Sequence, residues 1–312
     1  VQEVDGQARF SVAPADRPVL SSDGRWMAAR MVPSLADRET ADRPGELRNR
    51  LAIVSLPGGQ VETVEDVRAF AFSPDGRFLR WHLYAPRTDD DGDDATDAPE
   101  REEGQGTTMV VRTLATGQEV RVEDVDACAF AEEGARLACT VASSDDARDG
   151  MWVWDLGAGT EVAAHRRADG LYGAPTWNEG GSALAFVVAD RTEGDRPTYG
   201  SVNVWDGSSA SVAVDAAEAP DGWLIPTGTS LDWSDDGSRL FFGWRPVHAE
   251  ERRALEEAPA DDEGFDAYDV DDILDDRGVD VWHWQDDRIM PQQKVVWNRE
   301  KDRTYRAVHH FD

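Results

Sequence analysis

The sequence predicts an all-β protein, specifically a β-propeller of four-stranded antiparallel blades. Three observations lead to this fold class: a repeat with a period near 50 residues, an alternation of apolar residues with period two inside each repeat, and a second pair of short alternating runs in most repeats. Period two is typical of a strand with one buried face. Four-stranded sheets repeated at this spacing are the blades of a propeller.

Each repeat opens with an aromatic residue or Leu that is followed four positions later by Gly. The glycines are 52, 58, 47 and 56 residues apart. Apolar residues then return at every second position, and an Asp-Gly pair between two such runs indicates a tight hairpin turn, because Gly adopts positive φ without steric cost. We therefore expect a hairpin at each of five openings, near residues 20, 72, 130, 177 and 233: Leu20–Gly24, Phe72–Gly76, Phe130–Gly134, Trp177–Gly181 and Trp233–Gly237.

Four of the repeats continue with a second hairpin, so that each would form a sheet of four strands. These second hairpins are expected at Leu51–Gly59, Met109–Gly117, Met151–Gly159 and Val202–Gly207. With further strands expected from Val279 onward, the chain would hold about five to six blades. If the ring has seven or eight blades, as in larger propellers, the others would lie beyond Asp312.

We expect residues 1–312 to form one propeller domain interrupted by two acidic insertions. The first is 86–106, for which a solvated loop is the expectation. The second is 246–278, which begins with a predicted short helix over Ala249–Ala258. Arg252 and Arg253 of this helix could contact a neighbouring domain, and a purely solvated insertion fits the composition equally well.

The chain is strongly acidic, with 63 Asp and Glu against 32 Lys and Arg and a formal net charge of -31. This charge excludes nucleic acid as a partner. Lys294 and Lys301 are the only lysines, and the acidic residues are spread along the whole chain, which is typical of proteins adapted to high salt. We therefore expect a halophilic source, the alternative being a charged face that attracts a basic partner.

No membrane association is expected, because no run of 18 apolar residues occurs. Val1–Phe10 lack the basic start and apolar run of a signal peptide, and both ends of the chain look cut, so a fragment is expected. The location is left open between the cytoplasm and export. Two cysteines do not decide the redox compartment.

Several segments resemble a known family. The repeat openings, such as Phe72–Gly76, resemble the PD40 or WD40-like repeats of TolB-like propellers, which also form the N-terminal half of bacterial prolyl oligopeptidase family (S9) serine peptidases. The opening Leu20–Met27 fits the first blade of these peptidases. A second tract is similar to one in the propellers of large bacterial S9-type peptidases: Val279–Asp286, Ile289–Lys294 and Asn298–Tyr305.

The resemblance implies an α/β-hydrolase domain with a Ser-Asp-His triad, C-terminal to the propeller. No Gly-x-Ser-x-Gly occurs in the chain, so the nucleophile of such a domain is absent here and no catalytic residue is assigned. The Glu-Glu pair of dipeptidyl-peptidase-type propellers is also not found. Glu250-Glu251 and Glu256-Glu257 are paired, but their Ala, Leu and Arg-rich setting predicts an exposed helix.

The leading hypothesis is therefore a non-catalytic propeller domain that gates peptide access to a hydrolase active site in the same polypeptide. Its partners would be that hydrolase domain and peptide substrates. The alternative is a stand-alone TolB-like propeller that acts as a protein-binding scaffold. An enzyme with its own active site in the propeller tunnel is disfavoured, since no convergent acid–base or metal-binding set is apparent, and no cofactor is expected.

The strongest candidate for a metal site is the acidic stretch Asp89–Glu100. Asp89, Asp91, Asp93 and Glu100 have the spacing of calcium ligands in an EF-hand loop, with Asp97 between them. The position that requires Gly is Asp94, however, and strands replace the expected flanking helices. No metal site is therefore assigned, and these four residues stay weak candidates.

Three other features are considered as sites and given structural explanations. His283 lies between Trp282 and Trp284 but, by strand alternation, on the opposite face from both. Cys128 and Cys139 would lie directly opposite each other across a two-residue turn at Glu133-Gly134, and two free buried thiols are favoured over a disulfide. A set of tryptophans at repeat positions is assigned to packing between blades: Trp152, Trp154, Trp205, Trp233 and Trp244.

Overall fold

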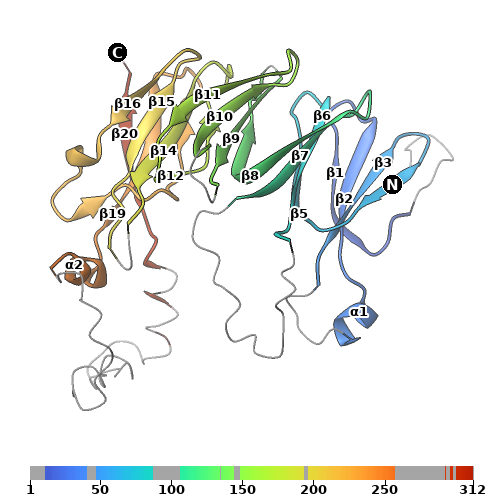
Figure 1. Ribbon diagram of the computed structural model, residues 1–312, viewed down its shortest axis with the longest axis horizontal. Helices are drawn as coiled ribbons and strands as arrows, with labels where there is room; N and C mark the ends of the chain where they lie inside the picture. Colours follow the sequence, from blue (N-terminus) through green and yellow to red (C-terminus); the bar gives the residue numbers. More distant parts are fainter. Residues whose placement is uncertain are drawn as a thin grey trace.

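The protein consists of antiparallel sheets that follow one another along an arc (Figure 1). The computed structural model describes residues 11–40, 47–86, 106–133, 135–143, 148–192, 196–256, 292, 296–297 and 300–311. In Figure 1 the sheet of the first strands lies at the right end of the arc, and the sheet that contains β19 and β20 lies at the left end. The predicted all-β propeller architecture is confirmed.

The first blade has four antiparallel strands in sequential order: β1 (Ala15–Leu20), β2 (Trp26–Met31), β3 (Arg50–Ser55) and β4 (Val61–Val64). Helix α1 (Leu35–Thr40) lies between β2 and β3. Along β2 and β3 residues on both faces are buried, which is why Leu51–Val54 form a continuous apolar run rather than an alternating one.

The second and third blades form one continuous sheet of seven strands: β5 (Val67–Phe72), β6 (Phe78–Leu83), β7 (Thr107–Thr113), β8 (Glu119–Phe130), β9 (Arg136–Val141), β10 (Gly150–Asp155) and β11 (Thr160–Arg166). The first half of β8 pairs with β7, from Glu119 to Val125, and the second half pairs with β9, from Val125 to Phe130. Asp124 has a left-handed φ of 59° at the point where β8 changes partner. One strand therefore serves as the last strand of blade 2 and the first strand of blade 3.

The fourth and fifth blades each begin with a first strand split in two. Blade 4 comprises β12 (Gly170–Tyr172), β13 (Thr176–Trp177), β14 (Leu184–Asp190), β15 (Ser201–Trp205) and β16 (Ala210–Val214), and both β12 and β13 pair with β14. The 3-10 helix Ala216–Glu218 follows it. Blade 5 comprises β17 (Trp223–Leu224), β18 (Asp232–Trp233), β19 (Arg239–Pro246) and β20 (Tyr305–His310), with β17 and β18 both on β19.

The buried apolar residues of the described part of the chain form four clusters, and each one lies between two consecutive blades. Leu51 and Ile53 of blade 1 pack with Leu79 and Trp81 of blade 2. The remaining clusters join blades 2 and 3, blades 3 and 4, and blades 4 and 5 in the same way. Burying one large apolar side chain contributes roughly 1.5–3 kcal/mol, so these interfaces, rather than the sheets alone, hold the arc together.

The hairpin turns explain the repeat motif. Ser73 accepts a hydrogen bond from the Phe78 backbone N–H at 2.9 Å and donates to Asp75 at 2.6 Å, while Asp75 accepts from the Arg77 backbone N–H at 3.0 Å. Gly76 has a φ of 71°, as the turn requires. The same set of bonds recurs around Ser21 and around Ser234.

The turns are longer than the two-residue turn expected at Glu133-Gly134. Ala131 N–H donates to the Arg136 carbonyl, so four residues separate the closing pair, as in the other openings. The predicted register is nevertheless correct, because Cys128 lies opposite Cys139 and Phe70 lies opposite Trp81. A four-residue turn built on a tight bend followed by a left-handed Gly keeps the same facing pairs as the two-residue turn.

The second insertion begins with a helix, as expected, α2 (Ala249–Glu256). Of the strands expected from Val279 onward, the structure places β20 at Tyr305–His310 as the third strand of blade 5. Residues 257–291 lie outside the described part of the chain, as do 87–105 of the first insertion.

Candidate functional site

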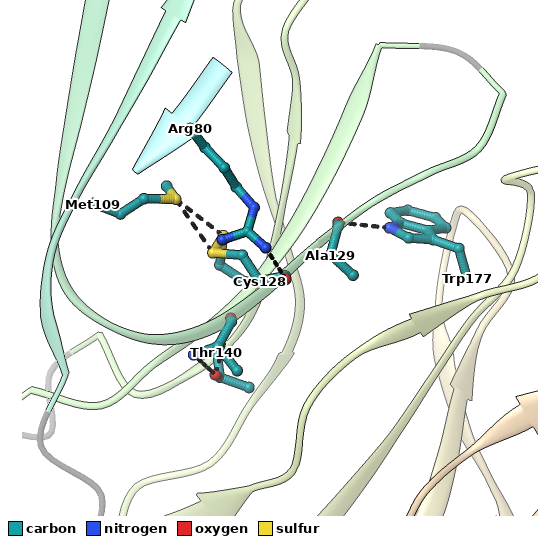
Figure 2. Close-up of a disulfide and its surroundings, with 8 residues drawn as sticks. Arg80, Met109, Cys128, Ala129, Thr140 and Trp177 are labelled. Carbon is teal, nitrogen blue, oxygen red and sulfur yellow. Dashed lines mark hydrogen bonds between the residues drawn. A yellow bond between two sulfur atoms is a disulfide. The ribbon is translucent and has the colours of Figure 1, made fainter. Parts of the chain in front are cut away.

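The first strands of blades 3, 4 and 5 lie side by side, joined by tryptophan side chains. Trp177 Nε1–H of β13 donates to the Ala129 carbonyl of β8 at 3.0 Å, and Trp233 Nε1–H of β18 donates to the Thr176 carbonyl of β13 at 3.2 Å. The first of these bonds is visible in Figure 2. Each bond satisfies a backbone carbonyl across a blade boundary, a contribution of about 1 kcal/mol. In a propeller the first strands surround the central channel.

A groove of about 580 Å³ runs across the turn ends of these three strands. We call it the inner groove. It is lined by residues from the three blades: Ala129, Phe130, Glu132, Pro175, Thr176, Trp177, Asn178, Glu179, Asp232, Trp233, Ser234 and Asp235. A volume of this size lies in the range of about 300–1,000 Å³ that small-ligand sites occupy.

The inner groove is negatively charged. Its lining holds four carboxylates, all exposed, and no Lys or Arg: Glu132, Glu179, Asp232 and Asp235. Arg306 of β20 pairs with Asp232 at 3.0 Å and lies over the ring of Phe241 at 4.1 Å from its centroid. The groove can therefore attract cations, and its aromatic residues offer surfaces on which a cation or a flat group can rest.

The described residues show no metal site in this groove. Among them no group of three or more His, Cys, Asp and Glu is arranged to hold a metal ion. The four weak calcium candidates, Asp89, Asp91, Asp93 and Glu100, lie outside the described residues, and so does His283 with its two neighbouring tryptophans. Those predictions remain untested.

The cysteine prediction is wrong. Cys128 and Cys139 form a disulfide, with Cα atoms 4.1 Å apart on the facing strands β8 and β9. Figure 2 shows the bridge beside the Met109 sulfur, which lies 3.3 Å from Cys128 Sγ. The predicted facing register is compatible with two free thiols and with a bridge. The bridge can form because facing residues of antiparallel strands lie close together.

Two basic side chains of β6, Arg80 and His82, are two positions apart and lie on the same face of the strand, and Arg80 contacts the strand that carries Cys128. Arg80 Nη2–H donates to the Cys128 carbonyl at 2.9 Å, and burial lowers the pKa of Arg80 to about 10. His82 is 3% exposed, and burial, followed by the charges of Arg80 and Arg68, lowers its pKa to about 4. Neither Arg80 Nε nor His82 Nε2 has a hydrogen-bond partner among the described residues.

The expectation of an exposed helix is only partly correct. Glu251 of α2 is largely buried, and its carboxylate accepts two hydrogen bonds from Arg245, at 2.8 and 2.6 Å, and one from the His248 backbone N–H at 2.7 Å. Burial raises the pKa of Glu251, but these hydrogen bonds outweigh it and hold the pKa below its ordinary value. The pair anchors the helix to β19, while Arg252 is exposed.

The tryptophan prediction is supported, with one addition. Trp154 and Trp205 belong to the interblade clusters, and Trp152, Trp233 and Trp244 pack against them. The addition is that Trp177 and Trp233 also line the inner groove. This groove was not among the sites predicted from the sequence, although the acidic residues that follow Phe130, Trp177 and Trp233 two positions later were a signal for it.

Among the described residues, none of the helices has the length and apolar character needed to cross a membrane. No protein-family model matches the chain, and no curated protein matches it in sequence.

Solved structures similar in shape include propeller domains of peptidases. The β-propeller domain of the Trilobed protease from Pyrococcus furiosus matches with a TM-score of 0.44 and 13% identity, over 76% of this chain and 65% of that one. A structure from a study of two prolyl endopeptidases matches with a TM-score of 0.45 and 12% identity, over 76% and 34%. Hydrazine synthase from Kuenenia stuttgartiensis matches with a TM-score of 0.42 and 11% identity, over 73% and 61%.

The chain thus spans just under two thirds of the first of these structures and about one third of the second. The matches include structures named as peptidases and one named as hydrazine synthase, so they show a likeness of shape alone.

Proposed function

We propose that this chain is the N-terminal TolB-like propeller domain of an S9-type serine peptidase, which limits access to a C-terminal α/β-hydrolase domain of the same polypeptide. The observation that carries the proposal is the sequence resemblance: the five repeat openings together with the tract at Val279–Asp286, Ile289–Lys294 and Asn298–Tyr305. The consecutive blades and the open inner groove are compatible with it.

In this proposal the chemistry takes place outside residues 1–312. A serine of the hydrolase domain attacks the scissile carbonyl, a histidine takes its proton and passes it to the leaving amine, and backbone N–H groups stabilise the oxyanion. The propeller contributes selection by size. An extended peptide passes along the first strands at the centre of the ring, whereas a folded protein is too wide to enter.

The test uses the native protein isolated from its source. It is treated with a fluorophosphonate probe, which reacts with activated serines, and the labelled peptide is located by mass spectrometry. We expect labelling of a serine C-terminal to Asp312 and cleavage of short peptides but not of a folded protein with the same cleavage sites. A native protein that ends within one or two blades of Asp312, and that takes up no probe, would support the stand-alone scaffold instead.

A further inference from the structure

The acidic side chains of the inner groove occupy one equivalent position in three hairpin turns. Counting the aromatic residue or Leu of each opening as position one, position three is Glu132, Glu179 and Asp235 in blades 3, 4 and 5. In blades 1 and 2 the same position is Ser22 and Pro74. The three acidic residues all line the groove, and Ser22 and Pro74 do not.

The turn itself does not require an acid at position three. The acids at position four, Asp75 and Asp236, accept hydrogen bonds from a serine side chain and from a backbone N–H within their own turns. By contrast, Glu132, Glu179 and Asp235 form no hydrogen bond or ion pair through their side chains with the described residues. The same turn is built in blade 2 with Pro74 at this position, so the fold leaves it free.

Each of the three blades also places an aromatic residue in the groove, at position one of the same turn. These are Phe130, Trp177 and Trp233. Phe130 and Trp233 are half-buried and line the groove. The Arg80 guanidinium lies 5.8 Å from the centroid of the Phe130 ring, and Phe311 stacks on Trp233 with centroids 5.3 Å apart, so only part of each ring is open to a ligand. Blades 3, 4 and 5 thus repeat one aromatic residue and one free carboxylate at matched places. A guanidinium or ammonium group is attracted by the carboxylate through charge and by the exposed part of the ring, as the Arg80 guanidinium over Phe130 illustrates.

We propose that the inner groove binds an extended peptide segment that carries Arg or Lys side chains, with Glu132, Glu179 and Asp235 as the cation-binding residues. If the proposed function is correct, this peptide is the substrate of the peptidase, and the inference names its chemical class. The binding itself does not depend on the proposed function. The repeated spacing fits a chain with several cations better than a single small cation, because each blade supplies its own carboxylate.

The test measures peptide binding to the 312-residue chain by isothermal titration calorimetry at about 1 M salt, where charges are screened beyond about 3 Å and the general acidity of the surface contributes little. The probe is acetyl-Gly-Arg-Gly-Arg-Gly-amide. The matched probe has citrulline in place of both arginines, which keeps the shape and hydrogen-bonding groups and removes the charge.

Two variants with the same change in net charge are compared. The groove variant carries Glu132→Gln, Glu179→Gln and Asp235→Asn. The control variant carries Glu39→Gln, Asp221→Asn and Asp302→Asn, three exposed acids outside the groove lining. We expect the groove variant to bind the arginine peptide at least about tenfold more weakly than the unmodified chain, which is a loss of about 1.4 kcal/mol, and the control variant to bind it equally well. Circular dichroism of both variants checks that they fold.

The inference is overturned if the two variants weaken binding equally, if the citrulline peptide binds as well as the arginine peptide, or if the unmodified chain binds neither. These outcomes are separate from those for the proposed function. A labelled serine in the native protein without arginine-dependent binding leaves the peptidase proposal standing, and arginine-dependent binding without a labelled serine leaves a peptide-binding propeller.

Discussion

At the scale of single residues, the boundary between blades 2 and 3 places two basic groups of β6 out of water. Arg80 keeps a hydrogen bond to the Cys128 carbonyl, whereas His82 Nε2 has no partner among the described residues. Burying a charge without a partner is costly, so His82 is neutral in the folded protein near neutral pH. In the unfolded chain, His82 titrates at its ordinary pKa of about 6.5.

This difference predicts a loss of stability in mild acid. As the pH falls from about 6.5 towards 4, the unfolded chain binds a proton at His82 and the folded chain does not, so the free energy of unfolding decreases. Between pH 7 and pH 5, His82 should contribute a decrease of about 2 kcal/mol. His82→Leu should therefore show a shallower decrease than the unmodified protein in urea unfolding at these two pH values.

The control for this prediction is His310→Gln on the exposed side of β20, which removes one histidine without changing the buried position at His82. Equal pH dependence in His82→Leu and in the unmodified protein would mean that His82 does not titrate differently in the two states.

At the scale of elements, the disulfide between β8 and β9 closes one hairpin and lies in the core between two blades. Cys139 is fully buried, and the bridge joins residues that are 11 positions apart. A bridge over a loop of this length restricts the unfolded chain and stabilises the fold by about 3 kcal/mol.

We expect the denaturant midpoint to fall when the protein is unfolded and refolded with a reductant. The double variant Cys128→Ala, Cys139→Ala should have a lower midpoint in all conditions and no response to the reductant. Titration of thiols in the unreduced, denatured protein measures the bridge directly: finding two free thiols would contradict it.

The hairpins could be predicted from the sequence, because alternation and the Gly of each opening fix where a strand turns back. Four features could not. The split first strands β12–β13 and β17–β18 and the shared strand β8 depend on how blades meet, which a repeat does not encode. The disulfide could not be predicted because a bridge and a pair of free thiols require the same two facing strand positions. The inner groove depends on three turns being brought side by side, and each turn taken alone looks like an ordinary solvated loop.

At the scale of the whole molecule, the net charge of -31 means that repulsion between carboxylates opposes the folded state. The ion pairs between described residues are mostly at the surface, such as Arg25–Asp23 and Arg306–Asp232, and exposed pairs contribute only about 0–1 kcal/mol each. They leave most of the mutual repulsion between carboxylates unbalanced. Salt shortens the range of this repulsion from about 10 Å at 0.1 M to about 3 Å at 1 M.

The melting temperature should therefore rise by several degrees between 0.1 M and 2 M KCl. Sucrose at equal osmolality provides the control, since it favours the compact state without screening charge and should raise the melting temperature less. A melting temperature that stays constant with KCl, or that rises equally with sucrose, would show that charge repulsion is not what limits the stability of this protein.

The strand β8 has one further consequence, for folding cooperativity. In a propeller of separate sheets, one blade can open while its neighbours stay intact. Here blade 2 cannot release its last strand without removing the first strand of blade 3, and the Gly106 N–H to Ala142 carbonyl bond ties the two blades again beside it. We therefore expect blades 2 and 3 to fold and unfold as a single unit. The end of the inner groove formed by Ala129, Phe130 and Glu132 is anchored in that unit, the largest sheet of the described arc.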